Sequence, residues 1–285
     1  MEMLNDPVEH RALVERLFPQ LDVRTFRRVG DGWTCDTYDV NGEWIVQVPR
    51  SAYAADALRA QIAILPELAA ELSASIPAPE LVSSDPPCMA YRRLDGVAAA
   101  AAPVGIWPER LGRFLYDLHM VPPEIVGMRG STAEAVRAVR REEFDRLREV
   151  VLPLLEPDER ARADAMLHAY LDDDLNWRFA PCLTHRDLGP EHVLVSPTGD
   201  LVGVLDWEEV GIDDPAWDFA WWLHERPEVG RRALAAYGGQ PDERFRHRAW
   251  FVYALMPWHE VEHGAEAGDE TFVRSGLEGI RERMP

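Results

Sequence analysis

Four side chains with acid–base or metal-binding chemistry are grouped in the second half of the chain. His185, Asp187 and His192 share one polar segment, and Asp206 follows further along. An aspartate in such a segment can orient a hydroxyl group and accept its proton. A histidine and a second carboxylate can hold a divalent cation against phosphate oxygens. Because a lone His-x-Asp tripeptide is common, the additional carboxylate at Asp206 makes the combination informative.

Short apolar runs surround these residues and predict the strands that position them. Cys182-Leu183 precedes the polar segment, Val193-Leu194-Val195 follows it, and residues 201–205 lead into Asp206. A loop between two strands, followed by a third strand that ends in a carboxylate, holds side chains rigidly enough for catalysis. Several chemistries are open to such a loop, and phosphoryl transfer is one of them, because it requires little beyond an aligned nucleophile, a metal and a phosphate-binding surface.

The charge of the chain restricts its partners. The formal net charge is −20 over 285 residues, and all 30 of the lysine and arginine positions are arginines. Such acidity argues against a nucleic-acid partner, which requires a basic face. It agrees with a cationic ligand, although acidity that only increases solubility explains it equally well.

Cysteine usage and hydropathy favour a soluble protein of the reducing cytoplasm. Cys35, Cys88 and Cys182 have neither the spacing of a zinc site nor that of a disulfide framework. Apolar runs end well short of about 18 residues, so no transmembrane helix is expected. Residues 1–6 lack the basic flank and apolar core of a signal peptide.

The first third of the chain predicts a small α+β lobe. Helical apolar spacing covers residues 7–18 and 52–72. Five segments have the pattern of strands: 24–29, 34–40, 43–48, 80–83 and 88–92. Asn41-Gly42 marks a tight hairpin. Gly30 and Gly32, between the first two strands, would let backbone amides approach a phosphate, although any hairpin turn could use the same glycines.

An alanine-rich segment after residue 95 separates this lobe from a helical one. We predict a nucleotide-binding lobe at 1–95, a linker at 96–106 and a helical lobe at 107–285. Helical spacing in the second lobe covers 107–119, 132–155, 156–171, 229–237, 242–264 and 268–283. Asp214-Pro215 is expected to open a further helix through Leu223. The fold class is therefore α+β, with a cleft between lobes for a nucleotide.

The combined motif resembles that of the aminoglycoside phosphotransferases, a family of antibiotic kinases with a protein-kinase-like fold. The segments that carry the resemblance are His185–His192, Asp206-Trp207 and Gly211–Phe219. The order of elements agrees from about residue 20 to the C-terminus. The resemblance implies a small antiparallel sheet in the first lobe and a mostly helical second lobe. It also implies transfer of the γ-phosphate of ATP or GTP to an antibiotic hydroxyl, and thereby antibiotic resistance.

The resemblance assigns roles to residues of the loop and its surroundings. Asp187 would be the catalytic aspartate, and His192 and Asp206 would ligate Mg²⁺. His185 would hold the loop through hydrogen bonds, and Asp218 would support the loop backbone. Histidine at position 192, where many members have asparagine, is similar to the 2″-aminoglycoside and macrolide kinase branches. Because Mg²⁺ prefers oxygen ligands, His192 could instead hydrogen-bond a phosphate or a water molecule.

The nucleotide side departs from the pattern of the family. Kinases of this type place a lysine or arginine in the third strand and pair it with a glutamate on the next helix. The matching positions here are Gln47 and Gln61. Two glutamines can hydrogen-bond one another, but they provide no positive charge. We expect them to have been replaced together, with Arg50 as a candidate for the missing charge.

The base of the nucleotide is expected against the backbone of Ala90, Tyr91 and Arg92, and the choice between ATP and GTP stays open.

The acceptor pocket is expected in the second lobe, and the candidates to line it are Glu208, Glu209, Trp258 and Glu262. Carboxylates would pair with the ammonium groups of an aminoglycoside, whereas aromatic faces would suit a macrolide ring or a sugar. Glu208 and Glu209 are favoured because they follow Asp206 directly. Taken singly, most of the tryptophans in this lobe are better explained as core residues, and most of the glutamates as solvated side chains.

Three functions stay open on this basis. The leading one is an aminoglycoside kinase, and the second is a kinase of a macrolide or a small metabolite. The third is a catalytically weak, kinase-like binding protein, which Gln47 and Gln61 suggest. The presence of Asp187, His192 and Asp206 together favours an enzyme, because a chain freed from catalysis need not keep all three.

Overall fold

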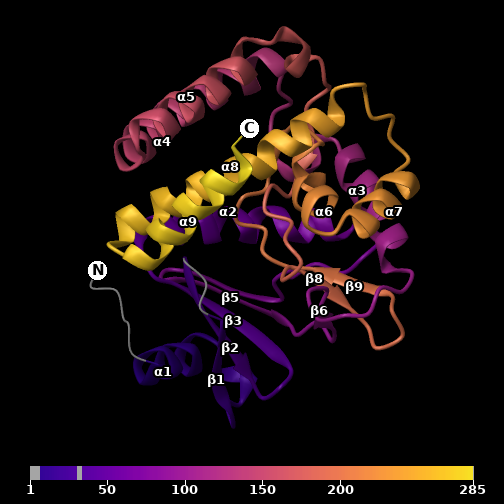
Figure 1. Cartoon of the computed structure of the whole chain (residues 1–285). Coiled ribbons are helices and arrows are strands. Elements are labelled where there is room, and N and C mark those ends of the chain that lie inside the picture. The colour runs from indigo at the N-terminus through magenta and orange to yellow at the C-terminus, as the bar shows by residue number, and fades with distance from the viewer. Residues whose placement is uncertain (1–6, 31–33, 285) are drawn as a thin grey trace.

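A computed structural model describes residues 7–30 and 34–284 and divides them into two lobes (Figure 1). The first lobe contains one antiparallel sheet with two helices, and the larger second lobe is mostly helical (Figure 1). The chain is therefore an α+β protein with the predicted protein-kinase-like arrangement. No helix in the described part of the chain is long and apolar enough to cross a membrane.

The first lobe is built on a five-stranded sheet of order β1-β2-β3-β5-β4 in which all neighbours are antiparallel. The strands are β1 (Phe26–Gly30), β2 (Cys35–Val40), β3 (Trp44–Pro49), β4 (Leu81–Ser84) and β5 (Pro87–Arg92). All five predicted strands are present. The predicted hairpin is confirmed, because Asn41 and Gly42 have φ values of 61° and 73°, as a primed two-residue turn requires.

Two helices complete the first lobe, α1 (Pro7–Leu17) and α2 (Ala52–Ala69). Ser51 begins α2, since its side chain accepts a hydrogen bond from the Ala54 N–H at 3.0 Å. The helix buries Leu58, Leu65 and Leu68 in a core that also includes residues of the second lobe. This packing places Gln61 on the buried side of α2.

The two lobes share a small sheet that the sequence did not predict in full. β6 (Val97–Ala98), inside the predicted linker, pairs with β8 (Val193–Val195), which pairs with β9 (Leu201–Val204). Ser75 of the first lobe adds backbone hydrogen bonds to Val202 and Val204 at 3.3 and 3.0 Å. Gly203 permits this approach, because a Cβ atom there would lie 2.7 Å from the Ser75 carbonyl oxygen.

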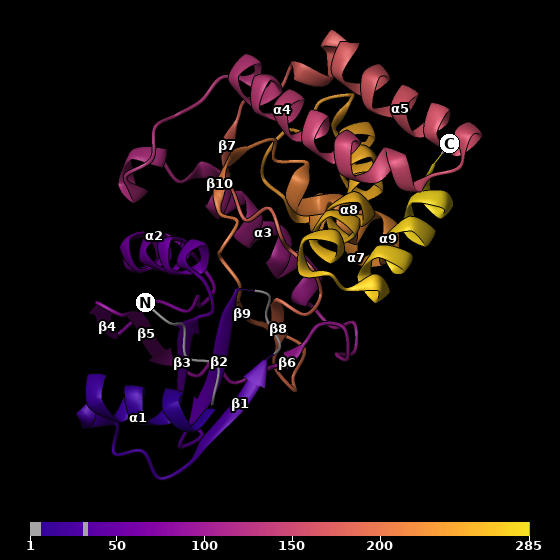
Figure 2. The ribbon, with the colours of Figure 1, turned by 90° about the vertical axis from the view of Figure 1, so that its left-hand side faces the viewer.

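The second lobe consists of helices packed on two apolar clusters. They are α3 (Trp107–Met120), α4 (Ala133–Val151), α5 (Pro157–Asp172), α6 (Ala220–Glu225), α7 (Pro227–Ala236), α8 (Phe245–Ala267) and α9 (Glu270–Arg283). One cluster surrounds α3, and the other lies between α4, α5 and α8. Figures 1 and 2 both place α4 and α5 side by side on the outer side of the lobe, away from the first lobe.

A short two-stranded sheet includes the strand directly before the polar loop. One helix predicted after this sheet begins later than expected. β7 (Cys182–Thr184) pairs antiparallel with β10 (Gly211–Asp213). The helix predicted from Asp214 begins only at Ala220, after a 3₁₀ turn at Trp217–Phe219. The Asp214 carboxylate does accept the Ala216 N–H at 3.0 Å, as an N-cap residue would, but the residues that follow form the 3₁₀ turn and the α-helix starts only after it.

Candidate active site

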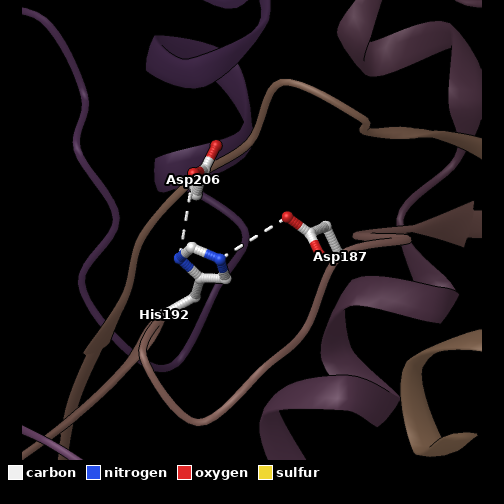
Figure 3. A group of neighbouring side chains, drawn as sticks. All are labelled: Asp187, His192 and Asp206. Carbon is white, nitrogen blue, oxygen red and sulfur yellow. Dashed lines mark ion pairs between the residues drawn. The ribbon is translucent and has the colours of Figure 1, made fainter. Parts of the chain in front are cut away.

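The loop between β7 and β8 brings Asp187 and His192 together with Asp206, which follows β9 (Figure 3). Asp187 Oδ2 lies 3.5 Å from His192 Nε2, and Asp206 Oδ2 lies 3.8 Å from His192 Nδ1. One ligand atom from each of the three lies within 4.8 Å of the others. The Asp187 side chain is 57% exposed, so a substrate can reach it.

Charge in this cluster favours an ionised Asp187. Burial acts to raise the pKa of Asp187, but the hydrogen bond and the charge of His192 lower it overall. Burial conversely acts to lower the pKa of His192, and the carboxylates of Asp187 and Asp206 raise it. Two carboxylates and an imidazole at this spacing fit a divalent cation, although Mg²⁺ usually takes only oxygen ligands. The donor set therefore agrees with the predicted metal site.

His185 holds the loop from inside the protein. It is fully buried, and its Nε2 donates to the Leu205 carbonyl oxygen at 2.8 Å while its Nδ1 accepts the Asp187 N–H at 3.3 Å. Burial lowers the pKa of His185, which agrees with a neutral ring that donates on one side and accepts on the other. The ring therefore ties the start of the loop to the strand end that precedes Asp206.

Asp218 holds the same loop by its backbone. Its carboxylate accepts the N–H groups of His185 and Arg186 at 3.0 and 2.8 Å. The imidazole of His119, on α3, donates to it at 3.0 Å. Burial opposes ionisation of Asp218, yet the hydrogen bond and charge of His119 keep its pKa below the usual range. His119 was not predicted, because its partner Asp218 lies 99 positions away in the chain.

Two residues beside the reacting groups have a left-handed backbone. Arg186 has φ 70° and Asp206 has φ 61°, and each such non-glycine residue costs on the order of 1–3 kcal/mol. The indole N–H of Trp217 donates to the Arg186 carbonyl oxygen at 2.5 Å, next to the bonds from Asp218. Packing and hydrogen bonds thus maintain a conformation that the loop alone would avoid.

The nucleotide side of the cleft is less complete. Gln47 lies on β3 and Gln61 on α2, and both have a buried side-chain atom without a hydrogen-bond partner, Gln47 Oε1 and Gln61 Nε2. Among the described residues no hydrogen bond joins the two amides. Arg50, the predicted replacement for a basic residue, donates to Asp36 at 2.9 Å. Arg28 contacts the same Asp36 oxygen at 2.8 Å, so the two arginines share the charge of one carboxylate.

The other residues predicted to touch the nucleotide lie on the first sheet. Gly30 ends β1, whereas Gly32 falls outside the described residues. Ala90 and Tyr91 are buried in β5, and the exposed Arg92 stacks on Trp44, with 3.9 Å between the guanidinium carbon and the ring centroid. Their contact with a base stays a prediction.

The predicted acceptor residues have different surroundings. Glu208 accepts a hydrogen bond from the Thr34 hydroxyl across the cleft, and burial, with the charge of Asp206, raises its pKa to about 7. Glu209 is exposed and lies 3.8 Å from Arg186. Trp258 is fully buried, so it offers no surface to an acceptor and belongs to the core.

Glu262 belongs to a row of ions that joins α4 and α8. It accepts a hydrogen bond from Arg146 at 2.6 Å, and its other oxygen lies 3.8 Å from His259 Nδ1. His259 Nε2 lies 3.1 Å from Glu143 on α4. Glu143 was not predicted, because helical spacing alone cannot tell this buried carboxylate from the solvated ones nearby.

Comparison with known sequences finds similarity over most of the chain. The model of the phosphotransferase enzyme family matches residues 25–251. The uncharacterized protein YcbJ of Bacillus subtilis (strain 168) is 26% identical over 265 residues, which are 85% of this chain and 84% of that protein. Viomycin phosphotransferase of Streptomyces vinaceus is 31% identical over 138 residues, which are 47% of each chain.

Known structures share the fold over nearly the whole chain. The GDP and kanamycin complex of APH(2")-IIIa aligns with a TM-score of 0.84 at 23% identity, and the alignment covers 97% of this chain and 98% of that one. Macrolide 2'-phosphotransferase type I aligns with a TM-score of 0.79 at 21% identity, covering 98% and 99%. At these identities the likeness concerns the fold alone.

Proposed function

The chain belongs to the phosphotransferase enzyme family, and from that premise we propose that it transfers the γ-phosphate of ATP or GTP to a hydroxyl group of an antibiotic. Its most suitable acceptor is an aminoglycoside, so its role is antibiotic resistance. The observation that carries the proposal is the exposed, ionised carboxylate of Asp187, held on a fixed loop 3.5 Å from His192. The three free cysteines favour action in the cytoplasm.

Asp187 performs the central step in this proposal. Its carboxylate accepts a hydrogen bond from the acceptor hydroxyl and aims the oxygen at the γ-phosphorus. The hydroxyl proton passes to Asp187 as the new O–P bond forms. The bond between the γ-phosphorus and the β–γ bridging oxygen breaks, and the nucleoside diphosphate leaves. His192 and Asp206 would hold Mg²⁺, which when bound supplies positive charge against the phosphate oxygens.

The charge around the cleft supports a cationic acceptor. Glu208 and Glu209 follow Asp206, and the charges of both raise the pKa of the exposed Tyr53, so all three groups face one region. Carboxylates form strong hydrogen bonds with ammonium groups. The relatives named for viomycin and kanamycin support the same class of acceptor. The exposed ring of Tyr53 keeps a macrolide as the second candidate, since an aromatic face suits its ring or sugar.

A nucleotide-consumption assay tests the proposal, with ATP or GTP as donor and with aminoglycosides, viomycin and macrolides as acceptors. We expect acceptor-dependent turnover with an aminoglycoside, and a loss of about 10²–10⁴-fold in Asp187→Ala. Asp158→Ala is the control, because Asp158 is exposed on α5 and remote from the loop.

Turnover with macrolides alone would make a macrolide the acceptor in place of an aminoglycoside, and the proposed phosphoryl transfer would stand. A folded protein that consumes no nucleotide with any acceptor would instead favour the binding protein suggested by Gln47 and Gln61. Equal activity of Asp187→Ala and wild type would contradict the role of Asp187.

A further inference from the structure

Arg140 is a buried arginine on α4 that lies outside every catalytic motif of the sequence. It is 5% exposed, and its guanidinium bonds the carboxylates of Glu143 and Asp213. Its guanidinium carbon lies 3.9 Å from the centroid of the Trp217 ring. One planar cation therefore binds two carboxylates and one aromatic face at the same time.

Two of the three partners of Arg140, Asp213 and Trp217, also contact Arg186, the residue before Asp187. Asp213 Oδ2 lies 3.6 Å from Arg186 Nε, and the Trp217 indole N–H donates to the Arg186 carbonyl oxygen at 2.5 Å. Arg186 is one of the two left-handed residues of the site. Because the next residue is Asp187, the φ angle of Arg186 sets the direction of the Asp187 side chain.

We propose that Arg140 is a positioning residue for phosphoryl transfer, which acts through Asp213 and Trp217 to keep Arg186 left-handed and Asp187 aimed at the acceptor hydroxyl. The inference rests on the proposed function for its kinetic consequence. Arg140 touches no reacting atom, and its effect reaches the substrate only through the loop.

The contacts explain why the residue is an arginine. The guanidinium is a planar fork that binds carboxylates from its edge and stacks on an aromatic ring with its face. A lysine carries a point charge, so it could neutralise Asp213 but could not bridge it to Glu143 while covering Trp217. Arg140→Lys therefore keeps the charge and removes the geometry.

The molecule contains a matched control in Arg248. This residue is fully buried on α8 and pairs with Asp214, next to Asp213, with 2.5 Å between Nε and Oδ2. It also bonds Asp242 at 2.8 Å and lies 5.0 Å from the Phe179 ring centroid. Both arginines are buried ions beside adjacent aspartates. Arg140 bonds the Asp213 carboxylate directly and stacks on Trp217, whereas Arg248 is linked to Asp213 only through Asp214, whose N–H donates to Asp213 Oδ1 at 2.8 Å.

The first test compares kcat and KM of Arg140→Lys and Arg248→Lys with their thermal stability. We expect Arg140→Lys to lower kcat by about tenfold to a hundredfold, with KM for both substrates within about twofold of wild type. Arg248→Lys should lose stability with kcat unchanged. Equal kcat losses in the two variants, or a loss in KM alone, would overturn the inference.

A double-mutant cycle shows whether the effect passes through Asp187. In an Asp187→Ala background, single-turnover measurements should show no further loss from Arg140→Lys. A loss of the same size in both backgrounds would mean that Arg140 acts elsewhere. If Arg140→Lys does not fold, Trp217→Phe replaces it, since it removes the bond to the Arg186 carbonyl oxygen and keeps an aromatic ring.

Crystal structures of the variants separate this inference from the proposed function. Arg186 should leave the left-handed region in Arg140→Lys and keep it in Arg248→Lys. If wild type turned over no acceptor, the proposed function would fail, and the φ angle of Arg186 alone would decide the inference. A left-handed Arg186 in folded Arg140→Lys would overturn it.

Discussion

The loop around Asp187 and the pair of Gln47 and Gln61 differ in how far their buried polar groups are paired. Around Asp187, Asp218 accepts three hydrogen bonds and both nitrogens of His185 are paired, and among the described residues Arg186 Nε is the buried loop atom without a hydrogen-bond partner. On the nucleotide side, Gln47 and Gln61 each leave one buried atom unpaired. A buried unpaired polar group costs about 1–3 kcal/mol, which a ligand regains if it supplies the partner. If Gln47 and Gln61 hold a nucleotide as proposed, the geometry around Asp187 is fixed in advance, whereas the nucleotide side would be completed on binding.

The largest expected effect concerns the cation site, and it tests whether the catalytic side depends on charge as well as geometry. Asp206→Asn keeps the size of the side chain and tolerates the left-handed backbone. Turnover at fixed Mg²⁺ should fall by about 10²–10³-fold, and the Mg²⁺ concentration for half-maximal rate should rise. Steady-state rates across a Mg²⁺ series measure both.

Asp200→Asn is the control, because Asp200 is half exposed and lies before β9. An unchanged Mg²⁺ dependence in Asp206→Asn would contradict the assignment of a cation to Asp206.

The second prediction concerns a substitution that weakens the hydrogen bonds of Asp218 to the loop backbone and leaves Asp187, His192 and Asp206 unchanged. Asp218→Asn removes a buried charge and turns an amide N–H toward the N–H groups that now donate to Asp218. The free energy of unfolding should fall by about 2–4 kcal/mol, and kcat by about tenfold to a hundredfold. Denaturant unfolding and steady-state kinetics check the two effects.

Asp242→Asn is matched to it, since Asp242 also pairs with a buried cation, Arg248, but away from the loop. The loop has no special dependence on Asp218 if both variants lose the same fraction of kcat.

The third prediction concerns substitutions that restore a charged pair at positions 47 and 61, on the proposed nucleotide side. Gln47→Lys combined with Gln61→Glu should restore a cation with a partner and raise affinity for a non-hydrolysable nucleotide about tenfold, or about 1.4 kcal/mol. Gln47→Lys alone should gain less, because its buried charge would lack a partner. Calorimetric titration measures both. A gain in neither variant would show that the neutral pair is not what limits nucleotide binding.

The smallest expected effect concerns His259 on α8, which pairs with Glu143 on α4. Burial acts to lower the pKa of His259, but hydrogen bonds to Glu143 and Glu262 raise it to about 8. Because the folded pKa exceeds the unfolded value of about 6.5, this stabilisation is complete below about pH 6.5 and disappears as the pH rises through 8. Allowing for the partial exposure of the ring, it amounts to about 1 kcal/mol.

The measurement is the difference in unfolding free energy between wild type and His259→Gln from pH 6 to 9. That difference should shrink as the pH rises, and contributions common to both proteins, such as that of His192, cancel. A constant difference would contradict the ion pairs of His259.

The sequence predicted the parts of the site that are local in the chain. The loop from His185 to His192 and the carboxylate at Asp206 sit at the ends of short apolar strands, and such runs are recognisable on their own. The five strands of the first lobe were found for the same reason. Asn41-Gly42 was identifiable because few residues accept positive φ values.

Pairs distant in sequence could not be predicted. Arg140 and Asp213 are 73 positions apart, and nothing in the helical spacing of α4 distinguishes Arg140 from the other arginines of that helix. β6 was missed because two residues in an alanine-rich run have no periodicity, and the pairing that makes them a strand is with β8. Trp258 was overvalued because a composition of aromatic and acidic residues does not reveal which side chains the fold buries.

The sheet of β6, β8 and β9 links the candidate cluster to the segment that joins the lobes. Val193, which follows His192 directly, accepts the Ala99 N–H at 2.8 Å, and the His192 carbonyl oxygen accepts the Leu205 N–H at 2.7 Å. His192 and Asp206 are thus attached to the segment that joins the lobes, and the His185 ring connects the Asp187 backbone to the same strand end through the Leu205 carbonyl oxygen. Under the proposed roles, movement of the linker would therefore reach both the proton acceptor and the cation ligands. A substitution at Gly203, where a Cβ atom would lie 2.7 Å from the Ser75 carbonyl oxygen, is expected to disturb the whole cluster.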